Sequence, residues 1–129
     1  MWAYESVFYQ IYPMGFCGAP WENDSETVNR VSKIGTWAEH IASVGCNALY
    51  LSPVFESDSH GYDTRDFRKI DCRLGTNKDF AEVCGKLIHG GISGIDRRGD
   101  GREASRHVLL KPRHSIVDCV HALLQLTIL

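Results

Sequence analysis

The sequence holds 129 residues, the length of one domain, which is enough for a single hydrophobic core. A formal net charge of -2 and a pI near 6.3 provide no basic surface for nucleic acid. The N-terminus lacks a basic region before an apolar stretch, and no apolar run approaches the roughly 18 residues of a membrane span, so we expect a cytoplasmic protein that binds neither nucleic acid nor a membrane.

The cysteines give no sign of a metal or redox site. They are odd in number, widely spread and never arranged as a C-x-x-C pair. Such cysteines are typical of reduced thiols in the cytosol, and their spacing lacks the clustered ligands of a metal site. We therefore expect neither a metal nor another cofactor. The cysteines are Cys17, Cys46, Cys72, Cys84 and Cys119.

The first part of the chain predicts a strand and a helix. Residues 6–13, SVFYQIYP, are β-branched and aromatic and end at a proline, which predicts a strand that stops at Tyr12. Residues 14–30 are dense in glycine, proline, asparagine and aspartate and predict a connection. Apolar residues then recur at helical spacing over residues 33–44, and Gly45 follows where a C′ glycine stands.

A second strand and helix follow. Residues 46–55, CNALYLSPVF, are mostly apolar without alternation, which is typical of a strand buried on both faces. The charged stretch 52–76 predicts a loop, after which Thr76 caps a helix with an apolar stripe over residues 80–88 that ends at the glycines 90 and 91. This order predicts an α/β fold of right-handed βα units around a parallel sheet.

The pattern changes after residue 92. Residues 93–113 are rich in arginine and glycine, and their segment ISGIDRRGDGR does not supply the apolar strand that the series requires next. Residues 115–129 are apolar again and predict a C-terminal helix or, at LTIL, a strand. We therefore divide the chain at this point, and we expect its apolar end to fold back on the exposed sheet.

Four linked segments resemble one known family. VFYQIYP, WAEHIASVGCNALYLSPVF, SHGYDTRDFRKID and RLGTNKDFAEVCGKLIHGGI occur in this order over about residues 5–92. They resemble the first two βα units of the catalytic barrel of glycoside hydrolase family 13, the α-amylase family, and look most like its maltooligosaccharide- and cyclodextrin-degrading members. The resemblance implies a partial TIM barrel over residues 1–92, an irregular segment and an apolar helix in a divergent tail over residues 93–129.

The resemblance also implies a sugar site in the loop after the second strand. Tyr62 occupies the tyrosine position of the family's G-Y-D pattern, which stacks on the sugar next to the scissile bond, and Asp63 is the adjacent acid that helps to fix the pocket. His60 either joins this substrate-binding set or only packs beside the tyrosine. Taken without the family, these residues form a polar turn in which Gly61 supplies a special backbone angle.

Two residues near the second helix have expected structural roles. Asp71, in KIDCRLGT, is expected to hold the turn into that helix. Cys72 stands where the family usually has proline, which removes one source of rigidity from the turn without changing the fold.

No catalytic residue is assigned within the chain. Retaining hydrolysis needs two carboxyl groups about 5 Å apart, and in the α-amylase family they come from later strands. Asp96 and Asp100 lie near the expected third strand, but the N-H pair of the family's pattern does not follow them. The resemblance thus implies a glycoside hydrolase fragment that binds an α-glucan or maltooligosaccharide and is inactive alone. The alternative is a non-catalytic product, either a weak sugar-binding module or an inert truncated chain.

One further pattern lies in the tail. His114, Asp118 and His121 recur at i, i+4 and i+7, so a helix would carry these possible metal ligands on one face. A solvated polar stripe has the same spacing, and we assign no metal site. The sequence leaves the oligomeric state open.

Overall fold

The structure of the protein is a computed structural model, and it describes residues 6–90, 92–94 and 108–109. Some residues singled out in the sequence lie outside these ranges, and the expectations attached to them stay predictions. They are Asp96, Asp100, His114, Asp118, His121 and the C-terminal helix expected over residues 115–129.

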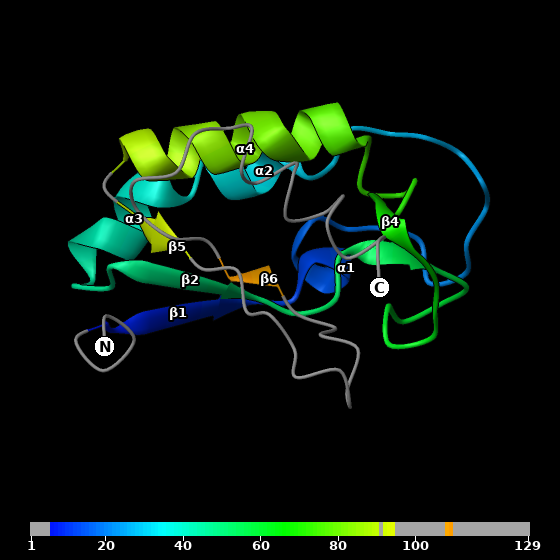
Figure 1. The fold of residues 1–129 in the computed structure, drawn as a ribbon, viewed down its shortest axis with the longest axis horizontal. Coiled ribbons are helices and arrows are strands. Elements are labelled where there is room, and N and C mark those ends of the chain that lie inside the picture. The colour runs from blue at the N-terminus through cyan, green and yellow to red at the C-terminus, as the bar shows by residue number, and fades with distance from the viewer. Residues whose placement is uncertain (1–5, 91, 95–107, 110–129) are drawn as a thin grey trace.

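A small parallel sheet forms one layer of the fold (Figure 1). β1 (Phe8–Ile11) and β2 (Ala48–Leu51) run parallel and pair along their whole lengths. Strand β5 (Ser93–Gly94) adds in parallel on the other side of β2, so the strand order is β1-β2-β5. Successive βα units produce this order, and the predicted arrangement around a parallel sheet is confirmed.

Strand β5 corrects the expectation that no strand follows residue 92. That prediction required an apolar run, whereas a two-residue strand needs only backbone groups positioned beside β2. Ile92, which is 2% exposed, anchors the segment in the core. Strand β6 (Val108–Leu109) pairs antiparallel with β2 opposite Tyr50 and Leu51. The apolar end expected to fold back on the sheet, residues 115–129, lies outside the described residues, so that expectation stays a prediction.

Helices cover one face of the sheet, and the longest is α4 (Asn77–His89) (Figure 1). Thr76 and Asp79 form a reciprocal capping box at its start. The Asp79 N–H donates to Thr76 Oγ1 at 3.2 Å, and the Thr76 N–H donates to Asp79 Oδ2 at 2.8 Å. The predicted cap at Thr76 and the predicted end at Gly90 are both confirmed.

The single helix expected over residues 33–44 is wrong in one respect, because it is divided into α2 (Ser32–Gly35) and α3 (Ala38–Ser43). Glycine weakens a helix, but a Cβ at position 35 would lie only 3.2 Å from Lys86 Cδ on α4. The glycine thus permits close packing of α2 and α4 at the cost of a continuous helix. Gly45, with a φ of +81°, ends the region as predicted.

The stretch 52–76 is more ordered than the expected loop. It contains an antiparallel hairpin of β3 (Phe55–Ser57) and β4 (Thr64–Ile70). The loop prediction failed because β4 reads TRDFRKI, in which charged residues outnumber the apolar ones. A short helix, α1 (Pro13–Phe16), begins at the proline that ends the first strand segment.

Apolar side chains between the sheet and the helices form the core. Its buried members include Ile34, Ile41, Leu49, Leu51, Phe80, Leu87 and Ile92. Within the described part of the chain, the helices are all too short or too polar to span a membrane.

Candidate functional site

The candidate site lies at the carboxyl ends of β1 and β2, which share one edge of the sheet because the strands are parallel. Residues 12–31, which follow β1, and the hairpin that follows β2 meet there (Figure 1). Asn23 joins them, because its N–H donates to the Asp58 carbonyl at 2.9 Å and its side-chain amide donates to the Ser57 carbonyl at 2.7 Å. This edge is where ligands bind in parallel α/β folds.

The Asp63 carboxylate organises residues 58–63, which we call the hairpin loop. Its Oδ2 accepts hydrogen bonds from the Ser59 N–H at 2.8 Å and the Ser59 hydroxyl at 2.7 Å, and its Oδ1 accepts one from the Gly61 N–H at 3.2 Å. Gly61 has a φ of +91°, and a Cβ there would lie 3.2 Å from Pro53 Cβ. The special backbone angle predicted at Gly61 is therefore confirmed.

Asp63 is an anion at neutral pH. Partial desolvation raises the pKa of its carboxyl, but the hydrogen bonds from Ser59 and from nearby backbone, together with His60, lower it more, so the pKa lies below its ordinary value. A carboxylate has about four lone-pair sites, of which the loop occupies three. Because 30% of the side chain is exposed, Asp63 can accept a further hydrogen bond from a ligand hydroxyl.

His60 supports the same loop. Its Nδ1 accepts a hydrogen bond from the Tyr62 N–H at 3.2 Å and lies 3.6 Å from Asp63 Oδ1. The Tyr12 hydroxyl donates to the His60 carbonyl at 2.9 Å. Because Nδ1 accepts this hydrogen bond, the ring tautomer that fits the contact is the one with its proton on Nε2.

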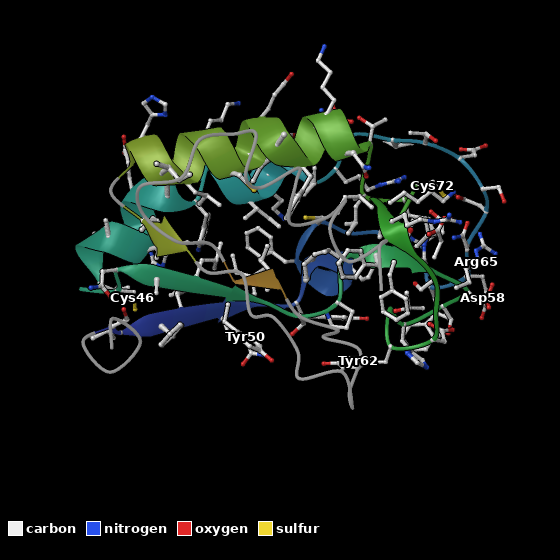
Figure 2. The ribbon with its side chains drawn as sticks, viewed as in Figure 1. Cys46, Tyr50, Asp58, Tyr62, Arg65 and Cys72 are labelled. Carbon is white, nitrogen blue, oxygen red and sulfur yellow. The ribbon has the colours of Figure 1, made fainter. Side chains whose placement is uncertain are left out.

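Three aromatic rings lie in sequence across the site, and we call them the aromatic cluster: Trp21, His60 and Tyr62. The ring centroids of Tyr62 and His60 are 6.1 Å apart, and those of His60 and Trp21 are 6.3 Å apart. Tyr62 is 42% exposed and Trp21 is 65% exposed. Figure 2 shows Tyr62 on the side of the hairpin that faces away from α4. The structure thus brings the three predicted residues together and adds Trp21, which no periodic pattern marks in the sequence.

A fully buried ion pair lies behind the aromatic cluster. Arg73 Nε and Nη2 donate to the two carboxylate oxygens of Asp71, each at 2.8 Å, and both side chains are 0% exposed. Arg73 Nη1 also donates to the carbonyls of Pro20 at 2.9 Å and Trp21 at 2.7 Å. Asp71 accepts further hydrogen bonds from the N–H and hydroxyl of Ser57. The structural role predicted for Asp71 is confirmed, and Arg73 extends it to the segment after β1.

A second buried carboxylate, Glu56, ties the hairpin together. Its oxygens accept hydrogen bonds from Arg65 at 2.8 Å, Asn23 at 3.0 Å and the Cys72 N–H at 2.9 Å. Burial raises the pKa of Glu56, but the hydrogen bonds from Arg65, Cys72 and Asn23, together with the charge of Lys69, outweigh it and lower the pKa to about 2. Arg65 also pairs with Asp58 at the outer end of the hairpin (Figure 2). Proline at position 72 has no N–H, so this chain holds the turn with a hydrogen bond that proline cannot make.

Glu56, Asp71 and Cys72 place possible metal-ligand atoms within 4.8 Å of one another, the one such group among the described residues. Both carboxylates already accept hydrogen bonds from arginine guanidinium groups, those of Arg65 and Arg73. Burial raises the pKa of the Cys72 thiol, which disfavours the thiolate that binds metals. The group therefore serves as an ion-paired structural network.

Comparison with known proteins finds relatives that share the sequence and the fold of this region. The sequence model described as "Alpha amylase, catalytic domain" matches residues 10–95. An oligo-1,6-glucosidase from Heyndrickxia coagulans is 35% identical over 93 residues, and Maltase 1 from Drosophila virilis is 32% identical over 96 residues. These alignments cover 70% and 73% of this chain, but the chain spans only 16% and 15% of the length of those two relatives.

Solved structures share the fold. The ligand-free cyclic α-maltosyl-(1→6)-maltose hydrolase from Arthrobacter globiformis matches with a TM-score of 0.56 and 33% identity, over 71% of this chain and 24% of its own. The complex of that hydrolase with maltose matches with the same TM-score of 0.56 and 31% identity. These likenesses confirm the predicted fold class, an α/β fold corresponding to part of a TIM barrel, and the matched residues agree with the segments that carried the resemblance.

Proposed function

The chain belongs to the α-amylase catalytic-domain family, and on that premise we propose that it provides part of the sugar-binding site of a glycoside hydrolase acting on α-glucans or maltooligosaccharides. In this proposal residues 1–92 are the barrel-derived part and residues 93–129 are a separate tail. The observation that carries the proposal is the position of Tyr62 and Asp63. They stand side by side in a rigid loop at the carboxyl end of a strand, inside the segment that matches the family.

Tyr62 and Asp63 have complementary chemistry for a sugar. A pyranose ring has an apolar face that an exposed aromatic ring covers, and its hydroxyls donate hydrogen bonds to a carboxylate. Tyr62 supplies the ring, and Asp63 supplies the remaining acceptor capacity of an ionised carboxyl group. His60 positions both residues by accepting from the Tyr62 N–H and lying beside Asp63.

The relatives indicate the class of sugar. One is named for 1,6-linked glucosides, and another hydrolyses a cyclic maltose dimer and has been solved with maltose bound. Both names describe glucose units joined by glucosidic bonds, so short maltooligosaccharides are the natural probes for this chain.

Binding and cleavage are separate properties in this proposal. Retaining hydrolysis requires a nucleophilic carboxylate and a general acid about 5 Å apart. Asp63 is committed to organising its own loop, while Glu56 and Asp71 are buried in ion pairs. We therefore expect the 129-residue chain to bind maltotriose without hydrolysing it.

A second candidate function is a non-catalytic sugar-binding module. It is favoured by one observation: among the described residues, the groups that support the hairpin loop lie between residues 10 and 77, so the candidate surface is formed within this chain. The two candidates are separated by adding the chain to a polypeptide that contains the rest of a family barrel and analysing the sugar products. A fragment of the enzyme is expected to restore hydrolysis, whereas a binding module is expected to bind sugar without restoring it.

The test of the proposed function is calorimetric titration of the 129-residue protein with maltotriose. Tyr62→Ala is expected to weaken binding about tenfold, since stacking contributes on the order of 1 kcal/mol. Tyr62→Phe is the matched control, because it keeps the ring and is expected to bind like the parent. Equal affinity of the alanine variant and the parent, or no binding by the parent, contradicts the proposal.

A further inference from the structure

Trp21 is the most exposed large hydrophobic side chain of those in the described residues, at 65% exposure. Its environment differs from that of a tryptophan at a loose loop tip. The carbonyls of Pro20 and Trp21 both accept hydrogen bonds from Arg73 Nη1, and Arg73 is itself fully buried and held by Asp71. A buried charge is therefore used to fix the peptide that carries an exposed indole.

The chain on either side of Trp21 is fixed as well. The Ala19 N–H donates to the Met14 carbonyl at 2.9 Å, which ties the approach to Trp21 to α1. Two residues after Trp21, Asn23 donates to the carbonyls of Asp58 and Ser57 in the hairpin. The backbone that carries the indole is thus held in place before any ligand arrives, which lowers the conformational entropy that binding would cost.

Trp21 is also connected to the proposed sugar platform through one intervening ring. Its ring contacts His60 at 6.3 Å and 61°, and the His60 ring contacts Tyr62 at 6.1 Å and 45°. Neither contact is a parallel stack, so His60 does not lie flat on the ring of Trp21 or of Tyr62. Trp21 therefore lies within about two ring spacings of Tyr62 and presents the same kind of apolar surface.

The chemistry of the indole selects the type of ligand. Its face is apolar and its Nε1–H is a donor, a combination that suits a group with both an apolar face and acceptor oxygens. Within the described part of the chain, that N–H makes no hydrogen bond. A pyranose ring has both features, and an α-glucan chain repeats them at every unit.

From these observations we infer that Trp21 is a second sugar-stacking position, which binds a glucose unit of the same α-glucan chain further along from the unit on Tyr62. The inference rests on the proposed function, because it extends the site at Tyr62. Trp21 then determines chain-length preference, and the Arg73–Asp71 pair acts as its positioning element. A ligand too short to reach from Tyr62 to Trp21 gains nothing from the tryptophan.

The test compares ligand lengths on the full 129-residue protein. The affinities for maltose and maltohexaose are measured by calorimetry for the parent, Trp21→Ala, Trp21→Phe and Tyr62→Ala. Trp21→Ala is expected to weaken maltohexaose binding about tenfold and leave maltose binding unchanged, whereas Trp21→Phe is expected to keep most of the parent affinity. Because the side chain is exposed, these variants are expected to unfold at the parent's urea midpoint.

The outcomes separate the two proposals. If Tyr62→Ala weakens both sugars while Trp21→Ala weakens neither, the proposed function stands and the inference about Trp21 is overturned. If Trp21→Ala weakens maltose and maltohexaose equally, Trp21 does not set chain length and the inference is again overturned. If the folded parent binds neither sugar, both proposals fail. Tryptophan fluorescence provides an independent test of the inference. Maltohexaose is expected to shift the emission of the parent to the blue, and this shift is expected to be lost in Trp21→Phe.

Discussion

The two ends of the molecule differ in the kinds of side chain that they bury. At one end, the sheet and its helices bury apolar side chains such as Leu49 and Phe80. At the other, the hairpin and the segment after β1 bury charged groups in addition to apolar ones such as Phe55, with Arg73 and Asp71 at 0% exposure and Glu56 at 2% exposure. Apolar burial tolerates small changes of shape, whereas a buried charge requires all of its partners. The exposed aromatic side chains of the candidate site lie on the end that charge holds in place.

The buried polar groups at the hairpin end hold the loops of the candidate site in place. Hydrogen bonds and bidentate ion pairs have directional geometry, so they fix a loop more narrowly than apolar contact does. The buried pair of Arg73 and Asp71 fixes the carbonyl of Trp21, and the Asp63 carboxylate fixes the loop of Tyr62. Preorganisation of binding groups is the expected benefit of placing costly polar groups behind a site.

Removal of one buried charge is expected to produce the largest effect. Arg73→Ala leaves Asp71 buried without its partner, and the loss is expected to be about 3–5 kcal/mol of unfolding free energy. Urea denaturation followed by far-UV circular dichroism measures it. The paired variant Arg73→Met with Asp71→Leu is the control, since it removes both charges and is expected to recover much of the loss. If Arg73→Ala loses less than about 1 kcal/mol of unfolding free energy, the buried ion pair does not stabilise the hairpin end.

A cavity in the apolar end is expected to have a smaller effect that is independent of the first. Leu49→Ala removes a fully buried side chain of β2, and the expected loss is about 3 kcal/mol. Leu49→Met, which conserves volume, is the control and is expected to lose less than about 1.5 kcal/mol. Sugar binding by the folded fraction of Leu49→Ala is expected to be unchanged. A loss of affinity in that fraction would show that the two ends are coupled.

Replacement of Cys72 tests one hydrogen bond at the charged end. Cys72→Pro removes the N–H that donates to Glu56 at 2.9 Å, and a hydrogen bond to a charged group is worth about 1.5–3 kcal/mol. Cys72→Ala keeps the N–H and isolates the contribution of the thiol. Equal unfolding free energies for the proline and alanine variants would show that this backbone hydrogen bond adds nothing.

Acid is expected to have the smallest effect near neutral pH. The pKa of Glu56 is lowered from its ordinary value of 4.5 to about 2, so its contribution is complete above pH 4.5 and is lost as the pH falls towards 2. Between pH 7 and pH 4 the expected loss from this group is less than about 1 kcal/mol. Arg65→Met removes the arginine that pairs with Glu56. The unfolding free energy of this variant is expected to depend less on pH between 4.5 and 2 than that of the parent. An identical acid profile in parent and variant contradicts the assignment.

The same contrast explains which features the sequence predicted. Helix α4 was predicted to its first residue because the cap at Thr76 and the apolar stripe are local signals. Strands β1 and β2 were predicted as strands from their apolar and aromatic runs. Both the helix and the strands belong to the end that buries mainly apolar side chains. There the spacing of apolar residues in the sequence directly indicates which side chains are buried.

The charged end was less predictable. Arg73 and Glu56 lie in the charged stretch that predicted a loop, and only the folded chain shows that their partners come from the segment after β1 and from the turn at Cys72. The hairpin was missed for this reason, and so was Trp21, whose exposure and neighbours depend on contacts across more than 50 residues. Tyr62 and Asp63 were found through the family resemblance, because a short polar turn is not by itself diagnostic.

The most direct test of the central claim is an amide NMR titration of the ¹⁵N-labelled 129-residue protein with maltohexaose. The sugar-binding site is expected at the hairpin end alone, so shift changes should be concentrated in residues 59–63 and at Trp21, with α4 unaffected. Changes spread over α4 and the edge of the sheet, or no changes at millimolar sugar, would contradict the assignment of a sugar site to this end of the fold.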